Sequence, residues 1–198
     1  YVEWAELEFI SRALQEKYPP AVLELAVGFE AFDDDIRNRV FGKGLALETF
    51  ERLVRDAAPY GFRIKCYFMQ KPVPDLGDDE AVADIQRGID YLDQLAAGHR
   101  GGFNLHLNPT YVARGTRLEP AFAAGKYVPP RLRDVARAAR HARGKRLTIY
   151  LGLSDEGMSV PGGSFLRPGE EDLVQRLEQF NRTQDFALLE TLCRQTPG

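Results

Sequence analysis

A strand pattern in the stretch Val22-Leu23-Glu24-Leu25-Ala26-Val27-Gly28-Phe29-Glu30 sets the architecture that we expect for this chain of 198 residues. Side chains of a strand alternate between its two faces, so Val27 and Phe29 share one face with the leucines. The two glutamates share the other face with Ala26 and Gly28. A strand buried on both faces would be apolar throughout. The alternation therefore predicts one face in the core and one face open to water or a ligand.

Three similar runs follow, at residues 64–69, 103–107 and 147–153. The starts of the four runs recur about every 40 residues, the length of a strand with a crossover helix and its loops. Between the runs, apolar residues repeat with helical spacing. This alternation predicts an α/β fold in which mostly parallel strands are joined by right-handed crossover helices.

The same patterns divide the chain into a repetitive part and a tail. We expect a single domain over residues 1–198, with β/α units in 1–153, a loop in 154–169 and a C-terminal helix in 170–198. The loop contains four glycines and two prolines and has no periodicity. Loops of this length in compact domains are usually functional or disordered.

The polar sides of the four strands are expected to gather on one face of the sheet. They are Glu24, Glu30, Lys65, Tyr67, Asn104, His106, Asn108, Thr148 and Tyr150. Burying such groups without partners would cost kilocalories each. Two arrangements avoid that cost: an open barrel around a ligand-sized lumen, and an open sheet whose second face is solvated. In parallel β/α folds, ligands bind at the C-terminal ends of the strands.

Composition excludes several classes of protein. The formal net charge of -3 excludes a uniformly basic nucleic-acid binder. The two cysteines, Cys66 and Cys193, cannot build a disulfide framework or a cysteine metal site, and their number favours a reducing cytoplasm. No apolar run approaches the roughly 20 residues of a membrane span, so we expect a cytoplasmic protein without membrane contact. A lone His106 lacks further ligands, and we predict no metal site.

One segment before the last strand is strongly cationic. It contains Arg131, Arg133, Arg137, Arg140, Arg143, Lys145 and Arg146 beside a single acid, Asp134. These side chains could neutralise RNA phosphates. We favour a solvated helix face, because cations are stabilised near the C-terminal end of a helix.

Several short motifs occur in one consistent order. They are Ala26-Val27-Gly28-Phe29-Glu30, Asp34-Asp35-Ile36-Arg37, Gly42-Lys43-Gly44-Leu45, Asn108-Pro109, Arg114-Gly115-Thr116, Gly125-Lys126-Tyr127-Val128-Pro129-Pro130 and Phe180-Asn181-Arg182-Thr183-Gln184-Asp185. In these motifs the chain resembles radical S-adenosylmethionine domains of the group with the elongator catalytic subunit and the tRNA methylthiotransferases. The likeness is greatest to archaeosine-synthesis radical proteins.

The resemblance implies a partial β/α barrel, the second half of a radical S-adenosylmethionine barrel. Tyr1-Val2 matches a position after the third strand of such a barrel, so the missing N-terminal half is an expected partner. In that family a C-x3-C-x2-C loop holds a four-iron four-sulfur cluster, and this sequence lacks the motif. The implied cofactors are S-adenosylmethionine and, in the intact protein only, the cluster.

The resemblance also implies site residues. Those for S-adenosylmethionine are Gly28, Glu30, Lys43, Lys65 and Asn108, and those for the substrate are Arg114 and Thr116. Glu30 matches a contact to the ribose or amino group, and Lys43 matches a partner of the methionine carboxylate. From the residues alone, other interpretations stay open. Glu30 could pair with Arg37 or Lys65, Lys43 could lie in a tight surface turn, and Asn108 could cap the turn that follows it.

The implied function is that of the C-terminal part of an enzyme whose 5'-deoxyadenosyl radical acts on RNA or a small molecule. Alone, the chain is expected to lack the reductive step, so its status as an enzyme stays open. Two alternatives are a cluster-free nucleoside- or phosphate-binding module and a protein-interaction module that docks a partner on its polar sheet face. In a half barrel the first strand has an unpaired edge, which predicts dimers or aggregation.

Overall fold

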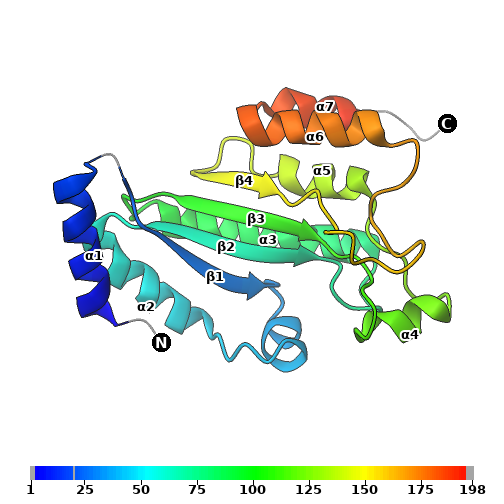
Figure 1. Cartoon of the computed structure of the whole chain (residues 1–198), viewed down its shortest axis with the longest axis horizontal. Helices are drawn as coiled ribbons and strands as arrows, with labels where there is room; N and C mark the ends of the chain where they lie inside the picture. The colour runs from blue at the N-terminus through cyan, green and yellow to red at the C-terminus, as the bar shows by residue number, and fades with distance from the viewer. Residues whose placement is uncertain (1–2, 20, 195–198) are drawn as a thin grey trace.

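A four-stranded, all-parallel sheet organises the protein. The structure is a computed structural model and describes residues 3–19 and 21–194. The strands β1 (Glu24–Glu30), β2 (Arg63–Gln70), β3 (Phe103–Pro109) and β4 (Leu147–Leu151) are neighbours in that order (Figure 1). The predicted α/β class with parallel strands is confirmed.

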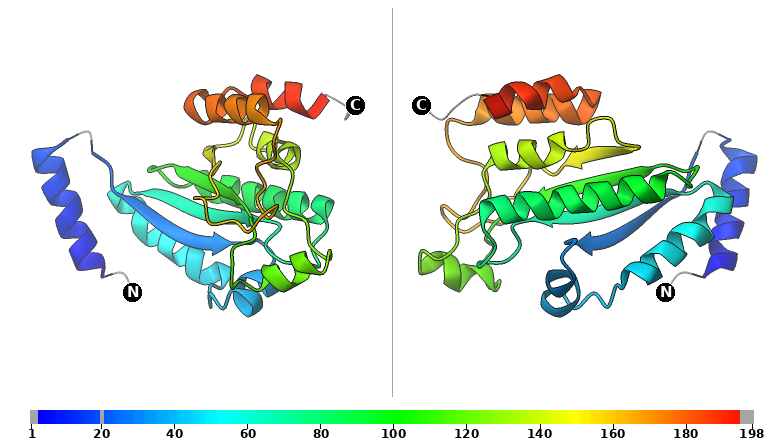
Figure 2. Two further views of the ribbon diagram at one scale, coloured as in Figure 1. Left: turned by 45° about the vertical axis from the view of Figure 1, so that its right-hand side comes forward. Right: turned by 180° about the vertical axis from the view of Figure 1, so that it is seen from behind.

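Crossover helices join successive strands and cover one face of the sheet. They are α2 (Leu47–Ala57) after β1, α3 (Asp78–Ala96) after β2 and α5 (Leu132–Arg140) after β3. Figure 2 shows all three on the same side of the sheet. Each crossover moves the chain by one strand in the same direction, as in a β/α barrel, whereas the strand order reverses in a doubly wound sheet. The sheet is consistent with a partial β/α barrel.

The strands alternate between a buried and an open face, as their sequence predicts. In β2, Ile64, Cys66 and Phe68 are buried against the helices, whereas Lys65 and Tyr67 are partly exposed on the other face. The same alternation continues through β3 and β4. Burial of the apolar face under the crossover helices is the main source of stability. The face that carries the polar side chains has no helix over it in the described chain (Figure 2).

Shorter elements surround this core. The helix α1 (Trp4–Lys17) precedes β1, the π-helix η1 (Asp35–Val40) follows β1, and a 3-10 turn η2 (Ala58–Tyr60) ends α2. The helix α4 (Leu118–Ala123) lies within the segment after β3. The helix α1 is only partly covered, because its apolar residue Ile10 is 41% exposed. Trp4 stacks on Tyr60 with ring centroids 6.2 Å apart.

The C-terminal segment forms two helices, whereas one was expected over residues 170–198. These helices are α6 (Glu171–Thr183) and α7 (Phe186–Arg194). Gln184 separates them with a φ of 53°, a left-handed conformation that ends a helix. Residues 195–198 of the prediction lie outside the described residues. Because the apolar spacing of this segment continues across the break at Gln184, the sequence pattern predicted one helix where there are two.

Two side-chain amides of this C-terminal segment close the outer edge of β4. Asn181 Oδ1 accepts a hydrogen bond from the Leu151 backbone N–H, and Asn181 Nδ2 donates one to the Leu151 carbonyl, both at 2.8 Å. Gln184 makes the same pair of bonds to Ile149, at 3.1 and 2.8 Å. No described strand lies beside the outer edge of β1. Any further strand of this sheet would therefore add at β1.

Candidate ligand-binding site

A cavity of about 470 Å³ lies at the C-terminal ends of the strands. Its lining includes Gly28, Glu30, Tyr67, His106, Asn108 and Gly152, which lie on or just after the four strands. The volume falls within the range of about 300–1,000 Å³ that is typical of small-molecule sites. The cavity occupies the position where parallel β/α folds bind their ligands.

An ion pair lies at the edge of this cavity: Glu30 lines it, and Lys43, the partner of Glu30, lies outside the lining. Lys43 Nζ lies 2.6 Å from Glu30 Oε1, and the two side chains are 34% and 15% exposed. Glu30 has a φ of 69°, in a left-handed region that costs a residue with a side chain about 1–2 kcal/mol. The pairing register with β2 shifts between Gly28 and Glu30. The interpretation in which Glu30 pairs with Arg37 or Lys65 is wrong, because Lys43 is its partner.

Gly28 provides the space for this ion pair. A Cβ atom at position 28 would lie 2.7 Å from Glu30 Oε1 and 2.8 Å from Lys43 Nζ. Both contacts involve the ends of flexible side chains, so a larger residue would displace the pair. Gly42 and Gly44, on either side of Lys43, have φ values of 63° and 58°, which glycine adopts without strain. This backbone geometry returns the loop to the end of β1.

Arg37 organises the loop between Glu30 and Lys43. Its side chain is fully buried and donates hydrogen bonds to the carbonyls of Leu45, Ala31 and Phe32, at 2.8, 3.2 and 2.7 Å. Because the guanidinium joins both ends of the loop, it holds Lys43 near the strand. Apart from the motif that contains Arg37, no feature of the sequence predicted this role.

Asp84 of α3 fixes the start of the same loop. Its carboxylate accepts hydrogen bonds from the backbone N–H groups of Phe32 and Asp33, at 2.9 and 2.8 Å. Burial raises the pKa of Asp84, whereas these two bonds and the nearby Arg87 act in the opposite direction. The loop that carries Lys43 is therefore attached to a crossover helix as well as to the sheet. Sequence reasoning did not identify Asp84.

Asn108 extends into the cavity from β3. An added Cβ at Gly152 would overlap Asn108 Oδ1 and would lie 3.3 Å from His106 Nε2. Gly152 thus allows both side chains to lie close to the end of β4. In the described part of the chain the Asn108 amide has no hydrogen bond, so its donor and acceptor are free for a ligand.

A row of rings crosses the open face beside the cavity. The His106 ring lies 4.9 Å from Tyr67 and 4.8 Å from Tyr150. Burial, followed by the charge of Lys65, lowers the pKa of His106, which keeps the ring neutral near pH 7. Lys65 shares this face but pairs with Glu24 at 2.7 Å and does not line the cavity. A hydrogen bond to Glu24 raises the pKa of Lys65.

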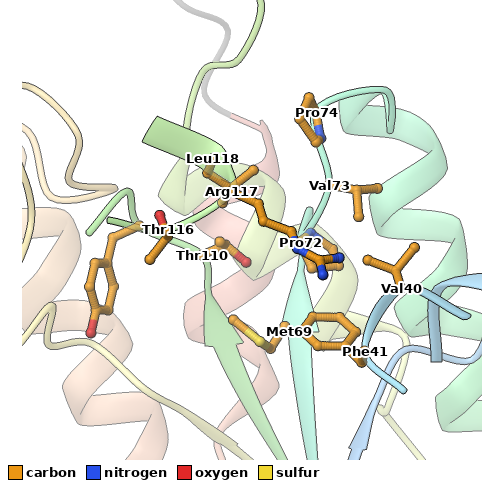
Figure 3. Close-up of a pocket in the computed structure, with 11 residues that line it drawn as sticks. Val40, Phe41, Met69, Pro72, Val73, Pro74, Thr110, Thr116, Arg117 and Leu118 are labelled. Atoms are coloured by element: carbon orange, nitrogen blue, oxygen red, sulfur yellow. The ribbon is translucent and has the colours of Figure 1, made fainter. Parts of the chain in front are cut away.

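The two residues expected to contact the substrate do not line this cavity. Arg114 is exposed and lines neither this cavity nor its neighbour. Thr116 lines the neighbouring cavity of about 390 Å³, together with Thr110 and Arg117 (Figure 3). The Thr116 hydroxyl donates to the Ala113 carbonyl at 2.7 Å, as expected at a turn. Arg117, which follows the motif directly, was missed by the sequence reasoning.

The described residues offer no cluster of metal ligands. Within residues 3–19 and 21–194, no three or more His, Cys, Asp or Glu side chains are arranged to hold a metal ion. Cys66 is buried on the helix-covered face of β2, and burial raises the pKa of its thiol. A protonated thiol on that face is a core residue and not a ligand.

Acidic side chains of α3 neutralise much of the cationic segment. The ion pairs include Arg137 with Asp79 at 2.7 Å, Lys145 with Asp90 at 2.7 Å and Arg146 with Asp93 at 3.0 Å. Arg131 pairs with Asp134 at 2.8 Å. The expectation that Asp134 is the one acid beside these cations was therefore wrong. Paired cations on a helix face fit the interpretation that we favoured over RNA binding.

The fold and the cavity define a class of protein: a parallel β/α protein whose ligand site offers a carboxylate, an amine and a free amide at the strand ends. No protein-family model matches the chain. Among curated proteins, the chain is similar to archaeosine synthase subunit beta of Methanosarcina acetivorans, with 30% identity over 179 residues. That alignment covers 85% of this chain and 47% of the relative.

Two further relatives match at similar length. Archaeosine synthase subunit beta of Thermococcus kodakarensis is 24% identical over 193 residues, which cover 91% of this chain and 54% of that protein. An uncharacterized protein of Methanocaldococcus jannaschii is 25% identical over 180 residues, which cover 89% of this chain and 48% of that protein. The chain is thus related to archaeosine synthase beta subunits and spans about half the length of the curated relatives it matches. None of the described helices has the length and apolar character to cross a membrane.

Proposed function

We propose that this chain is part of a radical S-adenosylmethionine enzyme that modifies RNA, and that the cavity at the strand ends binds S-adenosylmethionine. The sequence motifs support the cofactor class through their resemblance to that family. The names of the relatives support a role related to tRNA modification, because they refer to the synthesis of archaeosine. The parallel sheet with successive crossovers is consistent with a partial barrel of this type.

The observation that carries the proposal is the Glu30–Lys43 ion pair above Gly28. The amino-acid end of S-adenosylmethionine carries an ammonium and a carboxylate. Next to an ion pair, the ammonium would bind Glu30 and the carboxylate would bind Lys43, so every charge keeps an opposite partner. Glu30 could instead accept hydrogen bonds from both ribose hydroxyls. The free amide of Asn108 matches the donor and acceptor at the edge of adenine.

The residues of this chain do not fit the iron-sulfur cluster of the family. A cluster of this kind is held by a set of cysteine thiolates, and the chain has two cysteines without the required spacing. Cys66 faces the helices and is fully buried. In the proposal, the cluster and the first half of the barrel belong to the remainder of a longer protein, which would add its strands at the open edge of β1. We assign no step of the radical reaction to residues of this chain.

Calorimetric titration with S-adenosylmethionine tests the cofactor site. The wild-type chain should bind, and Glu30→Gln and Lys43→Met should each weaken binding by at least about tenfold, equivalent to 1.4 kcal/mol. Arg39→Met is the matched control, because Arg39 lies in the same loop, is 79% exposed and pairs with Asp35. It should change affinity by less than about twofold. No heat from a folded wild-type sample, or an equal loss in the control, would contradict the proposal.

A cluster-free nucleoside-binding module is the second candidate function. The carboxylate of Glu30 and the amide of Asn108 in one cavity favour it, because both groups can bind a nucleoside without a cluster. Such a module would bind adenosine as tightly as S-adenosylmethionine, and Lys43→Met would have no effect on either ligand. The radical-enzyme proposal instead expects adenosine to bind more weakly than S-adenosylmethionine, with the difference reduced by Lys43→Met. The same calorimeter therefore separates the two functions.

A further inference from the structure

A second cavity, of about 390 Å³, lies beside the first at the ends of β2 and β3 (Figure 3). Three segments supply its walls: the loop after β1 with Phe41, the turn after β2 with Pro72, and the segment after β3 with Leu118. Met69 and Tyr111 line both this cavity and the proposed S-adenosylmethionine site. A ligand in the second cavity would therefore lie next to a ligand in the first.

Arg117 is the one charged residue among the described side chains that line the second cavity. Figure 3 shows its side chain extending from the start of α4 across the cavity toward Pro72. No described carboxylate pairs with it, so the guanidinium is free to bind an anion. The planar fork of arginine suits the bidentate binding of phosphate.

Thr110 adds a buried polar group without a partner. Its side chain is 4% exposed, and Oγ1 has no hydrogen bond to any described residue. A buried hydroxyl without a partner is unfavourable, and a ligand in the cavity would satisfy it. Gln70, whose carbonyl accepts from the Thr110 N–H, is 1% exposed and also lacks side-chain partners. Of these two residues only Thr110 lines the second cavity, so its hydroxyl is the buried group that a ligand there can reach.

We infer that the second cavity binds one nucleotide unit, with its phosphate on Arg117 and an edge of its base at Thr110. The apolar walls at Phe41 and Pro72 suit the faces of a planar base. The inference rests on the proposed function, because the shared wall would place this nucleotide beside the adenosyl group. The unit can come from a free nucleotide or from an RNA strand, and the test below separates these sources.

The two methionines of the chain provide the readout. Met69 lies in the shared wall, whereas Met158 is 51% exposed in the loop after β4. In protein labelled at its methionine methyl groups, each nucleoside 5'-monophosphate and its parent nucleoside is titrated and followed by NMR. At least one monophosphate should shift the Met69 signal and leave Met158 in place. It should bind at least about tenfold more tightly than its nucleoside.

Variants assign the two contacts. Arg117→Gln should abolish the preference for the monophosphate, whereas Lys126→Gln, an exposed cation beyond the end of α4, should retain it. Thr110→Val keeps the volume of the side chain and removes its hydroxyl. It should therefore weaken the binding of the nucleotide and of the nucleoside by the same factor. The inference is overturned if no monophosphate moves Met69 in a folded sample. It is also overturned if the nucleoside binds equally well, or if both cation variants lose the preference.

Competition identifies the source of the nucleotide. If a tRNA displaces the monophosphate from the Met69 site, the bound unit is a nucleotide of an RNA strand. If the tRNA does not displace it, the bound unit is a free nucleotide. Both results support the chemistry of the cavity. S-adenosylmethionine binding that depends on Lys43, without any nucleotide effect, would overturn this inference and leave the proposed function standing. Nucleotide binding without S-adenosylmethionine binding would contradict the proposed function and leave the nucleotide site in the second cavity standing.

Discussion

The carboxylate of Glu30 and the ammonium of Lys43 meet 2.6 Å apart above Gly28, at the end of the first strand of the sheet. A partly exposed ion pair contributes only about 0–1 kcal/mol to stability. Holding the glutamate in a left-handed conformation costs at least as much. This balance supports the proposed role of the pair in ligand binding, because strained backbone is concentrated at functional sites.

Gly28→Ala should weaken ligand binding at the site and have little effect on the stability of the fold. The new methyl group would displace the ends of Glu30 and Lys43 but would meet no backbone atom within 3 Å. We expect S-adenosylmethionine affinity to fall by about tenfold, with a change of less than about 1 kcal/mol in the free energy of unfolding. Gly98→Ala is the control, since a Cβ there meets nothing within 4 Å. Equal affinity in both variants would count against the site.

Glu30→Gly should be more stable than Glu30→Gln. Both variants lose the ion pair, but only glycine adopts a φ of 69° without strain. The free energy of unfolding should differ by about 1 kcal/mol in favour of Glu30→Gly, measured by denaturation with urea. Neither variant should bind S-adenosylmethionine at wild-type strength. A less stable glycine variant would show that the left-handed backbone is not strained.

Asn181→Ala and Gln184→Ala should each destabilise the chain through the exposed edge of β4. Each substitution removes two hydrogen bonds to the backbone of β4, and we expect a loss of about 1–3 kcal/mol in the free energy of unfolding. The freed edge should also promote association at high concentration. Arg182→Ala, an exposed change in the same helix, should have little effect on either measurement. Similar losses in all three variants would refute the edge-closing role.

The open edge of β1 still predicts self-association of this chain. No described strand satisfies its outer backbone groups, and such edges pair with other chains. Light scattering over a concentration series should show dimers or larger species. Ala26→Lys places a charge at an exposed position of β1 and should reduce them. A wild-type chain that stays monomeric at high concentration would disprove this prediction.

The Asp93–Arg146 pair should make stability depend on pH in acid. Hydrogen bonds from the Arg146 side chain and backbone lower the pKa of Asp93 from its usual 3.8 to about 2. Because the folded state has the lower pKa, the stabilisation is complete above about pH 4 and is lost as the pH falls toward 2. The free energy of unfolding of Asp93→Asn should therefore differ from that of the wild type more at pH 5 than at pH 2. Urea denaturation that gives the same difference at pH 2 and pH 5 would contradict this assignment.

Much of the fold could be predicted because a strand buried on one face has alternating apolar and polar residues in its sequence. Alternating residues in each apolar run predicted the strands and their buried face, since the helices cover only one side of the sheet. The predicted runs differ from the observed strands by a few residues at their ends. The break at Gln184 was missed because a single left-handed residue does not interrupt apolar spacing. The partial covering of α1 could not be foreseen, because amphipathic spacing does not show which neighbour is present.

The candidate site was predicted less completely. Glu30, Gly28 and Asn108 do line the cavity, because strand ends on one edge of a parallel sheet necessarily lie together. Lys65 lies on the predicted face but outside the cavity lining, because the alternation defines the face of a residue and not its height along the strand. Both Arg114 and Arg117 are exposed, but only Arg117 lines the neighbouring cavity, because the turn between them directs the two side chains differently.

By itself, the sequence determined the class of fold, the polar face of the sheet and the lack of cysteines for a cluster, since these depend on residue type and local spacing. Only the tertiary structure decided that Lys43 is the partner of Glu30, that Arg37 and Asp84 hold the intervening loop, and that side-chain amides close β4. Such contacts depend on the three-dimensional path of loops and turns, where small changes in backbone angles move a side chain from one neighbour to another.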